Sequence, residues 1–105
     1  MPTTIGNLFA DSTAPAAGER LDVLLARGNV VIERIISSAR LEPASYLQTQ
    51  DEWVVLVRGE AELEVAGEPV RLKEGDYVFL PAGTPHTVKC ASDGALWLAV
   101  HVSPA

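Results

Sequence analysis

From residue 29 onward the chain alternates apolar and polar side chains with a period of two, the pattern of half-buried β-strands. The alternation is clearest in residues 60–65, where the glutamates share one face and the apolar residues the other. Residues 30–36 are strongly β-branched, and residues 53–57 are apolar on both faces, as in a strand that is covered on both sides. Short strands about 8–12 residues apart, with turn residues between them, predict an antiparallel β-sandwich or barrel.

The N-terminal part of the chain lacks this alternation. The first 18 residues are rich in Ala, Pro, Thr and Gly and predict an irregular arm that docks on the body. In residues 19–27 three leucines recur at helical spacing and Gly28 follows as a stop signal, so we expect a helix of about two turns. We therefore expect an arm and a short helix, residues 1–28, packed on a β-barrel of residues 29–105, together forming a single domain.

Composition and charge exclude several classes of function. The net charge of −6 and the lack of a Lys/Arg cluster argue against a nucleic-acid partner. Cys90 is the only cysteine, which excludes an internal disulfide, and we expect it to be a small buried apolar residue. No apolar run approaches the roughly 18 residues of a membrane span, and the N-terminus lacks the features of a signal peptide. These features predict a soluble cytoplasmic protein with no membrane partner.

The most informative stretch runs from Gly75 to His86. A glycine precedes a short apolar strand, and a Pro-x-Gly corner at Pro81 and Gly83 ends it. Proline presets one φ angle and glycine tolerates the positive φ of a tight reversal. The residue before Pro85 is driven to extended geometry, so His86 enters the next strand with a defined direction.

This stretch resembles the second conserved motif of the cupin superfamily, G-x5-P-x-G-x2-H-x3-N. Gly75, Pro81, Gly83 and His86 match it in type and spacing, and Cys90 stands at the asparagine position. The resemblance implies an all-β fold: a double-stranded β-helix, or jelly-roll, barrel that is commonly found as a homodimer. In a homodimer, the two-sided apolar strand at residues 53–57 would fit a sheet-to-sheet contact.

The first cupin motif is matched only at its end. Glu52 and Gly59 have the Glu-x6-Gly spacing, whereas the two histidine positions of that motif are occupied by Tyr46 and Gln48. In metal-binding cupins these histidines, the glutamate and the histidine of the second motif hold a divalent ion. The resemblance therefore implies a reduced metal set of Gln48, Glu52 and His86, to which Fe, Mn, Ni or Zn would be suited, or no metal at all.

We expect a polar cluster inside the barrel to bind a small-molecule ligand, which makes the binding of such a molecule the leading hypothesis. The residues of this cluster are Tyr46, Gln48, Glu52, His86 and, if it faces inward, His101. One alternative is a metal-dependent enzyme of the dioxygenase, isomerase or lyase type. Another is a dimeric sensor or scaffold without catalytic activity. The motifs leave the reaction and the ligand open.

Overall fold

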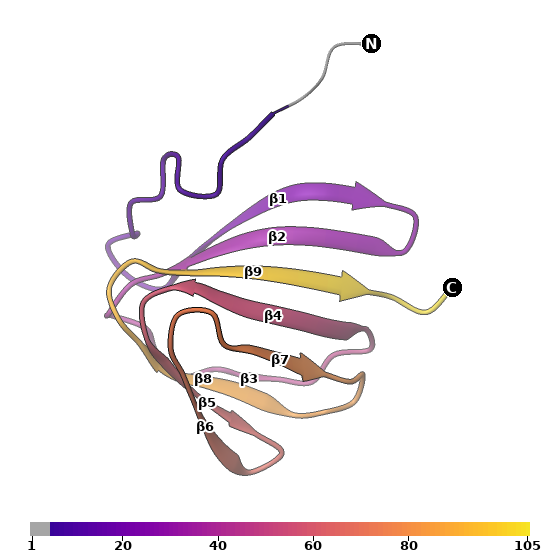
Figure 1. Cartoon of the computed structure of the whole chain (residues 1–105). Helices are drawn as coiled ribbons and strands as arrows, with labels where there is room; N and C mark the ends of the chain where they lie inside the picture. The colour runs from indigo at the N-terminus through magenta and orange to yellow at the C-terminus, as the bar shows by residue number, and fades with distance from the viewer. Residues whose placement is uncertain (1–4) are drawn as a thin grey trace.

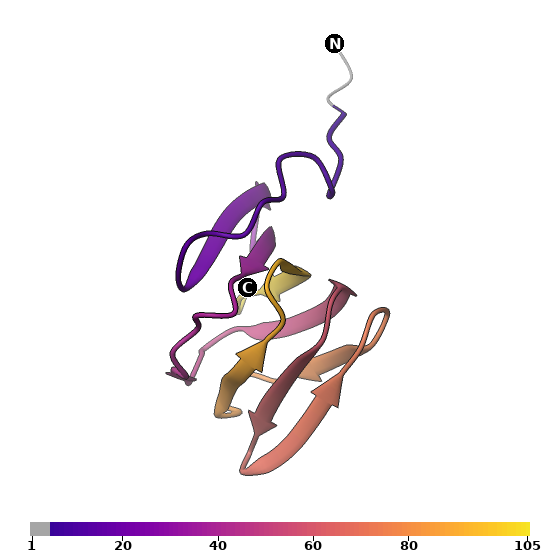
Figure 2. The same ribbon diagram turned by 90° about the vertical axis from the view of Figure 1, so that its left-hand side faces the viewer.

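The computed structural model describes residues 5–105, and the strands in this part of the chain form two antiparallel sheets that face each other (Figure 1 and Figure 2). One sheet has the order β1-β2-β9-β4-β7 and the other the order β3-β8-β5-β6. The strands are β1 (Glu19–Arg27), β2 (Val30–Ser37), β3 (Ser45–Tyr46), β4 (Asp51–Arg58), β5 (Ala61–Val65), β6 (Glu68–Leu72), β7 (Tyr77–Leu80), β8 (His86–Ala91) and β9 (Ala95–Val102). The all-β jelly roll expected from the sequence is confirmed.

The core lies between the two sheets and follows the alternation of the sequence. On β4 the inward positions Val54 and Leu56 are buried, and Leu63 of β5 and Trp97 of β9 pack with them. Burying one face of each strand is what holds an antiparallel sandwich together, at roughly 25 cal/mol for each Å² of apolar surface removed from water. The described residues contain no helix that could span a membrane.

The helix expected over residues 19–27 is wrong, because these residues form β1. This strand pairs with β2 along its length, and a bulge between Val23 and Leu25 accounts for the leucine spacing that resembled a helix. Gly28, interpreted as a helix stop, has a φ of 58° and forms the hairpin turn with Asn29 instead. The backbone hydrogen bonds offered by β2 therefore override the local helical pattern.

The expectation that Cys90 is buried is also wrong, because the cysteine is exposed. The register explains the difference. Glu62 pairs with Cys90 while the next residue, Leu63, pairs with Val88, so Lys89 is an extra residue in β8. A bulge of this kind reverses the inside–outside alternation beyond it, which turns the cysteine side chain to the outer surface.

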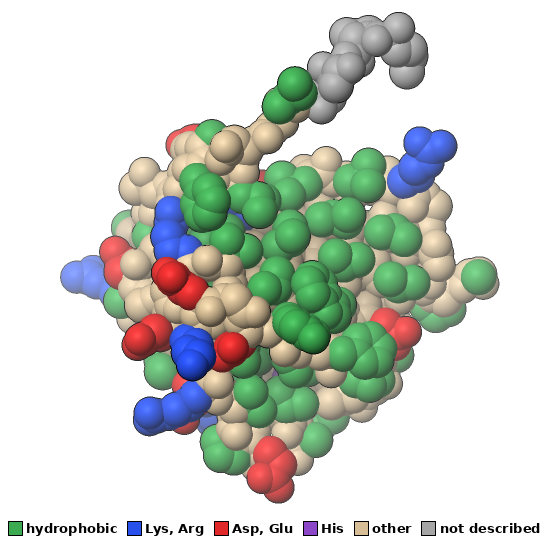
Figure 3. All heavy atoms as spheres, in the orientation of Figure 1, with side chains coloured by type: hydrophobic (Ala, Val, Ile, Leu, Met, Phe, Trp, Pro, Cys, Tyr) green, Lys and Arg blue, Asp and Glu red, His purple; other side chains and the backbone are tan. Residues whose placement is uncertain are grey.

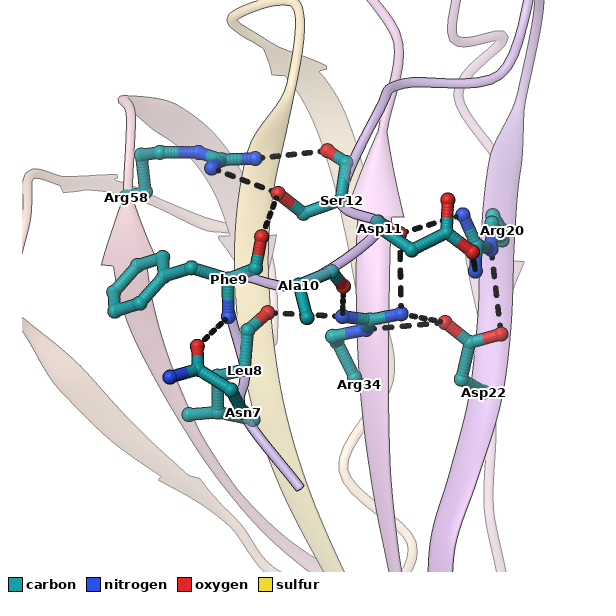
Figure 4. A network of polar contacts seen from close by, with 10 residues as sticks. All are labelled: Asn7, Leu8, Phe9, Ala10, Asp11, Ser12, Arg20, Asp22, Arg34 and Arg58. Atoms are coloured by element: carbon teal, nitrogen blue, oxygen red, sulfur yellow. Dashed lines mark hydrogen bonds and ion pairs between the residues drawn. The ribbon is translucent and has the colours of Figure 1, made fainter. Parts of the chain in front are cut away.

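Residues 5–18 form the N-terminal arm, which crosses the outer side of the five-stranded sheet (Figure 4). Arg34 of β2 is only 7% exposed and donates hydrogen bonds to the backbone carbonyls of Leu8 (2.9 Å) and Ala10 (2.6 Å) and to Asp22 (2.7 Å). The bond from Arg34 holds the pKa of Asp22 below its usual value. Arg58 contacts the arm further along (Figure 4). These hydrogen bonds attach residues 8–12 of the arm to the sheet, and residues 1–4 lie outside the described part.

The outer face of the five-stranded sheet is apolar beyond the arm (Figure 3). Trp53 of β4 faces outward opposite Phe79 of β7, and Tyr77 follows on the same face. Tyr77 and Phe79 are 67% and 55% exposed. Large aromatic side chains on an open sheet face are typical of a surface that becomes covered by another molecule.

Candidate functional site

A cavity of about 200 Å³ lies between the two sheets, at the end where β8 begins and β9 ends. Its walls combine apolar and polar side chains. The apolar lining residues are Leu21, Ile35, Val54, Leu63, Leu80, Val88 and Trp97. The polar ones are Glu19, Glu33, Tyr46, Gln48, Glu52, His86 and His101, so the structure places all five residues of the expected ligand cluster around one cavity.

Glu52 is the central polar group of the cavity. It points inward from the start of β4, on the same face as the buried Val54 and Leu56, and is 7% exposed. Burial raises the pKa of Glu52, because water no longer solvates the charged form, and the charge of Glu33 acts in the same direction. The imidazoles of His101 and His86 and the amide of Gln48 favour the ionised form and offset part of this increase.

His86 is positioned by the Pro-x-Gly corner. Gly83, at φ 79°, donates its backbone N–H to the carbonyl of Gln48 (2.8 Å), which ties the corner to the segment before β4. The ring of His86 is 8% exposed, and its Nδ1 lies 3.1 Å from the backbone carbonyl of Thr84. A carbonyl only accepts hydrogen bonds, so Nδ1 carries the proton. In the neutral ring, Nε2 therefore presents a lone pair, 3.8 Å from Oε1 of Glu52.

His101, which the sequence left unplaced, faces the cavity from β9. Its Nε2 lies 2.8 Å from Oε1 of Glu33 and donates to that carboxylate. Its Nδ1 lies 3.3 Å from the side-chain amide of Gln50 and 3.9 Å from Oε1 of Glu52. Two imidazole nitrogens thus lie near one carboxylate oxygen: Nε2 of His86 keeps a free lone pair, whereas the lone pair on Nδ1 of His101 accepts a hydrogen bond from the amide of Gln50.

Tyr46 and Gln48 lie on the β3 side of the cavity. Tyr46 pairs with His86 across β3 and β8, and their rings stack with centroids 5.6 Å apart. Burial raises the pKa of the Tyr46 phenol, as do the nearby charges of Glu19 and Glu52, so the hydroxyl keeps its proton at neutral pH. The two residues at the histidine positions of the first motif are therefore a phenol at the edge of the cavity and an amide beside the central carboxylate.

Sequence reasoning missed three polar contributors to this cavity. Glu33 is the single acidic residue in a β-branched run and lies at inward parity, a signal that could have identified it. Glu19 accepts a hydrogen bond from Ser37 (2.8 Å), which in turn accepts one from the indole of Trp97 (3.0 Å). Gln50 orients His101 from the loop before β4, and nothing in the local sequence pattern indicates this role.

The expected metal ligands do not form a ready-made metal centre. Within residues 5–105, no group of three or more His, Cys, Asp and Glu side chains has a metal-binding arrangement. The nitrogen atoms of His86 and His101 lie 3.8 and 3.9 Å from the Glu52 oxygen, which is beyond hydrogen-bonding distance. The chemistry of the three groups nevertheless corresponds to a set of two histidines and one carboxylate, which suits divalent transition metals.

The two facing sheets and the inward glutamate and histidine define a cupin barrel. The family model of the cupin domain matches residues 36–102, more than half of the chain, and the chain belongs to this family. The match ends at the last residue of β9 and so includes every inward-facing polar residue of the cavity that lies on β4, β8 and β9.

Solved structures and a curated protein resemble the chain. A Ralstonia eutropha JMP134 protein, provisionally assigned as a mannose-6-phosphate isomerase, is 37% identical, with a TM-score of 0.84 over 97% of this chain and 100% of its own. An RmlC-like cupin from Shewanella frigidimarina is 17% identical, with a TM-score of 0.76 over 88% of this chain and 82% of its own, and shares the fold. An uncharacterized protein of Aquifex aeolicus is 34% identical over 59 residues, 56% of this chain and about half (49%) of that protein.

Proposed function

We propose that this cupin binds a small molecule inside its barrel. The observation that carries the proposal is Glu52, a carboxylate 7% exposed that points into a cavity of about 200 Å³. Burying a carboxylate costs free energy unless partners compensate. The amide of Gln48 supplies part of this compensation, but neither imidazole beside Glu52 is within hydrogen-bonding distance. A ligand that bonds to this group would recover that cost. Apolar walls with a few convergent polar groups are the usual form of a small-ligand site.

The residues around Glu52 would have distinct roles. His86 and His101 are held by Thr84 and Glu33 and would orient the ligand without rearranging. Side chains that are fixed before binding lose little conformational entropy when the ligand arrives, which favours affinity. The apolar walls would exclude water and so strengthen each polar contact made inside.

Thermal stabilisation by a library of small metabolites tests this proposal. A ligand at one hundred times its Kd stabilises the folded state by about 2.7 kcal/mol, which is readily measured. Val88→Phe should abolish the effect by filling the cavity that Val88 lines, whereas Glu68→Gln, an exposed change on β6, should leave it intact. The proposal fails if no compound stabilises the wild type or if the two variants respond alike.

A second candidate function is metal-dependent catalysis, favoured by the two imidazole nitrogens that lie 3.8 and 3.9 Å from the same oxygen of Glu52. The donor set fits a divalent ion in chemistry, with His86, His101 and Glu52 as ligands and Gln48 as an amide donor. A bound ion would polarise a substrate oxygen or activate water. Elemental analysis after purification without chelator would support this candidate if a near-stoichiometric metal disappeared in both His86→Ala and His101→Ala. It would be refuted if the protein stayed metal-free when metal is supplied.

The cavity lining does not suit the phosphorylated sugar that the assignment of the Ralstonia protein implies. A phosphorylated sugar would bring two negative charges, and phosphate sites in proteins are typically built from Arg, Lys or a helix N-terminus. Among the described residues that line the cavity there is no Lys or Arg. We therefore do not propose phosphosugar isomerisation for this chain.

We also propose that two copies of the chain associate through the outer face of the five-stranded sheet. Trp53, Tyr77 and Phe79 lie there next to Val55, and Asp51 is the charged residue at the start of β4 on the same side, so the middle of the face suits an identical apolar partner. Five strands about 4.8 Å apart and up to nine residues long give the whole face an area of roughly 600 Å², part of which the arm covers. The open part is smaller than the ~800 Å² per partner of a standard interface, so the contact would be a small one.

Light scattering coupled to gel filtration tests this association. The wild type should have the mass of two chains at micromolar concentration, and Phe79→Asp should have the mass of one. Leu47→Asp is the matched control, because Leu47 is an exposed apolar residue outside the sheet face. A wild type that is monomeric at tens of micromolar, or a control that dissociates equally, would refute the association.

A further inference from the structure

The charges that line the cavity have one sign. Glu19, Glu33 and Glu52 all contribute carboxylates, and within the described chain no Lys or Arg lines the cavity. Glu33 is paired with His101 at 2.8 Å, and Glu52 is buried beside two imidazoles. An anion entering this space would approach three carboxylates without a fixed cation to compensate, and a low-dielectric cavity strengthens that repulsion.

The hydrogen-bonding groups next to Glu52 face the cavity as acceptors, and the donors in the lining are the phenol of Tyr46 and the side-chain amide of Gln48. The hydrogen of His86 is used by the carbonyl of Thr84, which leaves the lone pair on Nε2. The hydrogen of His101 is used by Glu33. Glu52, when ionised, can only accept. The indole N–H of Trp97, which also lines the cavity, is already donated to a serine hydroxyl.

The charges and the hydrogen-bonding groups that line the cavity constrain the ligand independently. Charge disfavours phosphates and carboxylates, and acceptor groups on the protein require donors on the ligand. The volume of about 200 Å³ is below the 300–1,000 Å³ of drug-sized pockets, so the ligand is also small. Hydroxyl and amino groups on a compact molecule satisfy all three conditions.

We propose that the cavity selects small, uncharged or positively charged molecules that carry hydroxyl or amino groups, and that it rejects phosphorylated and carboxylated ones. This inference rests on the proposed function, because it names the class of ligand for the same cavity. Glu52 and His86 accept hydrogen bonds from the donor groups, and the walls formed by Val88 and Leu63 cover the carbon skeleton.

A thermal-shift screen with four sets of compounds matched in size tests the inference. The sets are sugars and polyols, amino sugars and small amines, sugar phosphates, and sugar acids. Each hit is measured again with Val88→Phe, which fills the cavity, and with the exposed control Glu68→Gln. We expect cavity-dependent hits from the first two sets, and at least tenfold weaker binding when a phosphate or carboxylate is added to the same skeleton.

The outcomes separate the inference from the proposed function. Phosphates or acids that bind as tightly as their neutral parents, and lose binding in Val88→Phe, would overturn the ligand class while leaving a small-molecule site in the barrel. If no compound in any of the four sets binds in a manner sensitive to Val88→Phe, the proposed function fails and this inference falls with it.

Discussion

Gly59 occupies the last position of the first cupin motif, where both the backbone conformation and the neighbouring atoms require a glycine. Substituting it tests how closely Ser92 and Ala95 approach this turn. The φ of Gly59 is +95°, and a Cβ added there would lie 2.5 Å from Oγ of Ser92 and 3.0 Å from Cα of Ala95. Ser92 cannot move freely, because its hydroxyl accepts the backbone N–H of Glu60 at 2.9 Å. Gly67 is a matched control, since its φ is +83° and nothing lies within 4 Å of an added Cβ.

The two alanine variants share the free-energy cost of the left-handed backbone conformation and differ in the contacts of the added Cβ. A left-handed conformation costs a non-glycine residue about 1–2 kcal/mol, and the less flexible unfolded chain returns about 0.4–1 kcal/mol in both cases. Gly59→Ala also disturbs the hydrogen bond of Ser92, worth about 0.5–1.5 kcal/mol. It overpacks against the backbone of Ala95, at about 1–3 kcal/mol. We therefore expect Gly59→Ala to lose about 1.5–4.5 kcal/mol more of its free energy of unfolding than Gly67→Ala.

Urea denaturation, followed by the fluorescence of Trp53 and Trp97, measures this difference. Both variants should keep the m-value of the wild type, and their midpoints should differ. Adding Ser92→Ala to Gly59→Ala should restore part of the stability by removing the oxygen at 2.5 Å. If the two glycine variants unfold within 0.5 kcal/mol of each other, as judged by their free energies, the close approach of β9 to this turn is wrong.

Three further predictions concern the buried polar groups. Burial raises the pKa of Glu52, so the folded protein holds a proton that the unfolded chain has released above about pH 4.3. Stability is therefore lost as pH rises through the raised pKa. Glu52→Gln should gain in free energy of unfolding relative to the wild type as pH rises, and a difference independent of pH would contradict the assignment. Ser37→Ala should cost about 1–3 kcal/mol in urea denaturation, because it leaves the buried indole N–H of Trp97 without its acceptor; a cost near zero would show that the bond is dispensable. Arg34→Met should release the arm, so that limited proteolysis cuts residues 5–18 faster than in the wild type while β2 stays protected; equal cleavage rates would mean that Arg34 does not hold it.

The alternation of the chain was sufficient to predict the barrel, because a period of two leaves few ways to bury one face of every strand. It also gives Glu52 the same parity as Val54 and Leu56, so an inward direction of those two residues implies the same direction for the glutamate. The Pro-x-Gly corner needed no tertiary information either. Its φ requirements are local, and they aim His86 as soon as the strand is formed.

Periodicity and local turn geometry could not predict the contacts between segments that are distant in the sequence. Residues 19–27 are a strand only because β2 offers them hydrogen bonds, and the leucine spacing was equally compatible with a helix. The pairing of Glu33 with His101 joins residues 68 positions apart in the sequence. Neither residue indicates by itself which groups share its surroundings, so the acceptor-rich character of the cavity did not follow from the motif.

The sequence by itself determined the fold, the turns and the inward direction of the motif glutamate, because periodicity and backbone sterics act over a few residues. Only the tertiary structure decided that β1 belongs to the sheet, that a bulge turns Cys90 outward, and that His101 joins the motif histidine His86 beside Glu52. Strand register and the closure of the barrel place these groups. Both depend on the simultaneous packing of all the strands rather than on any local pattern.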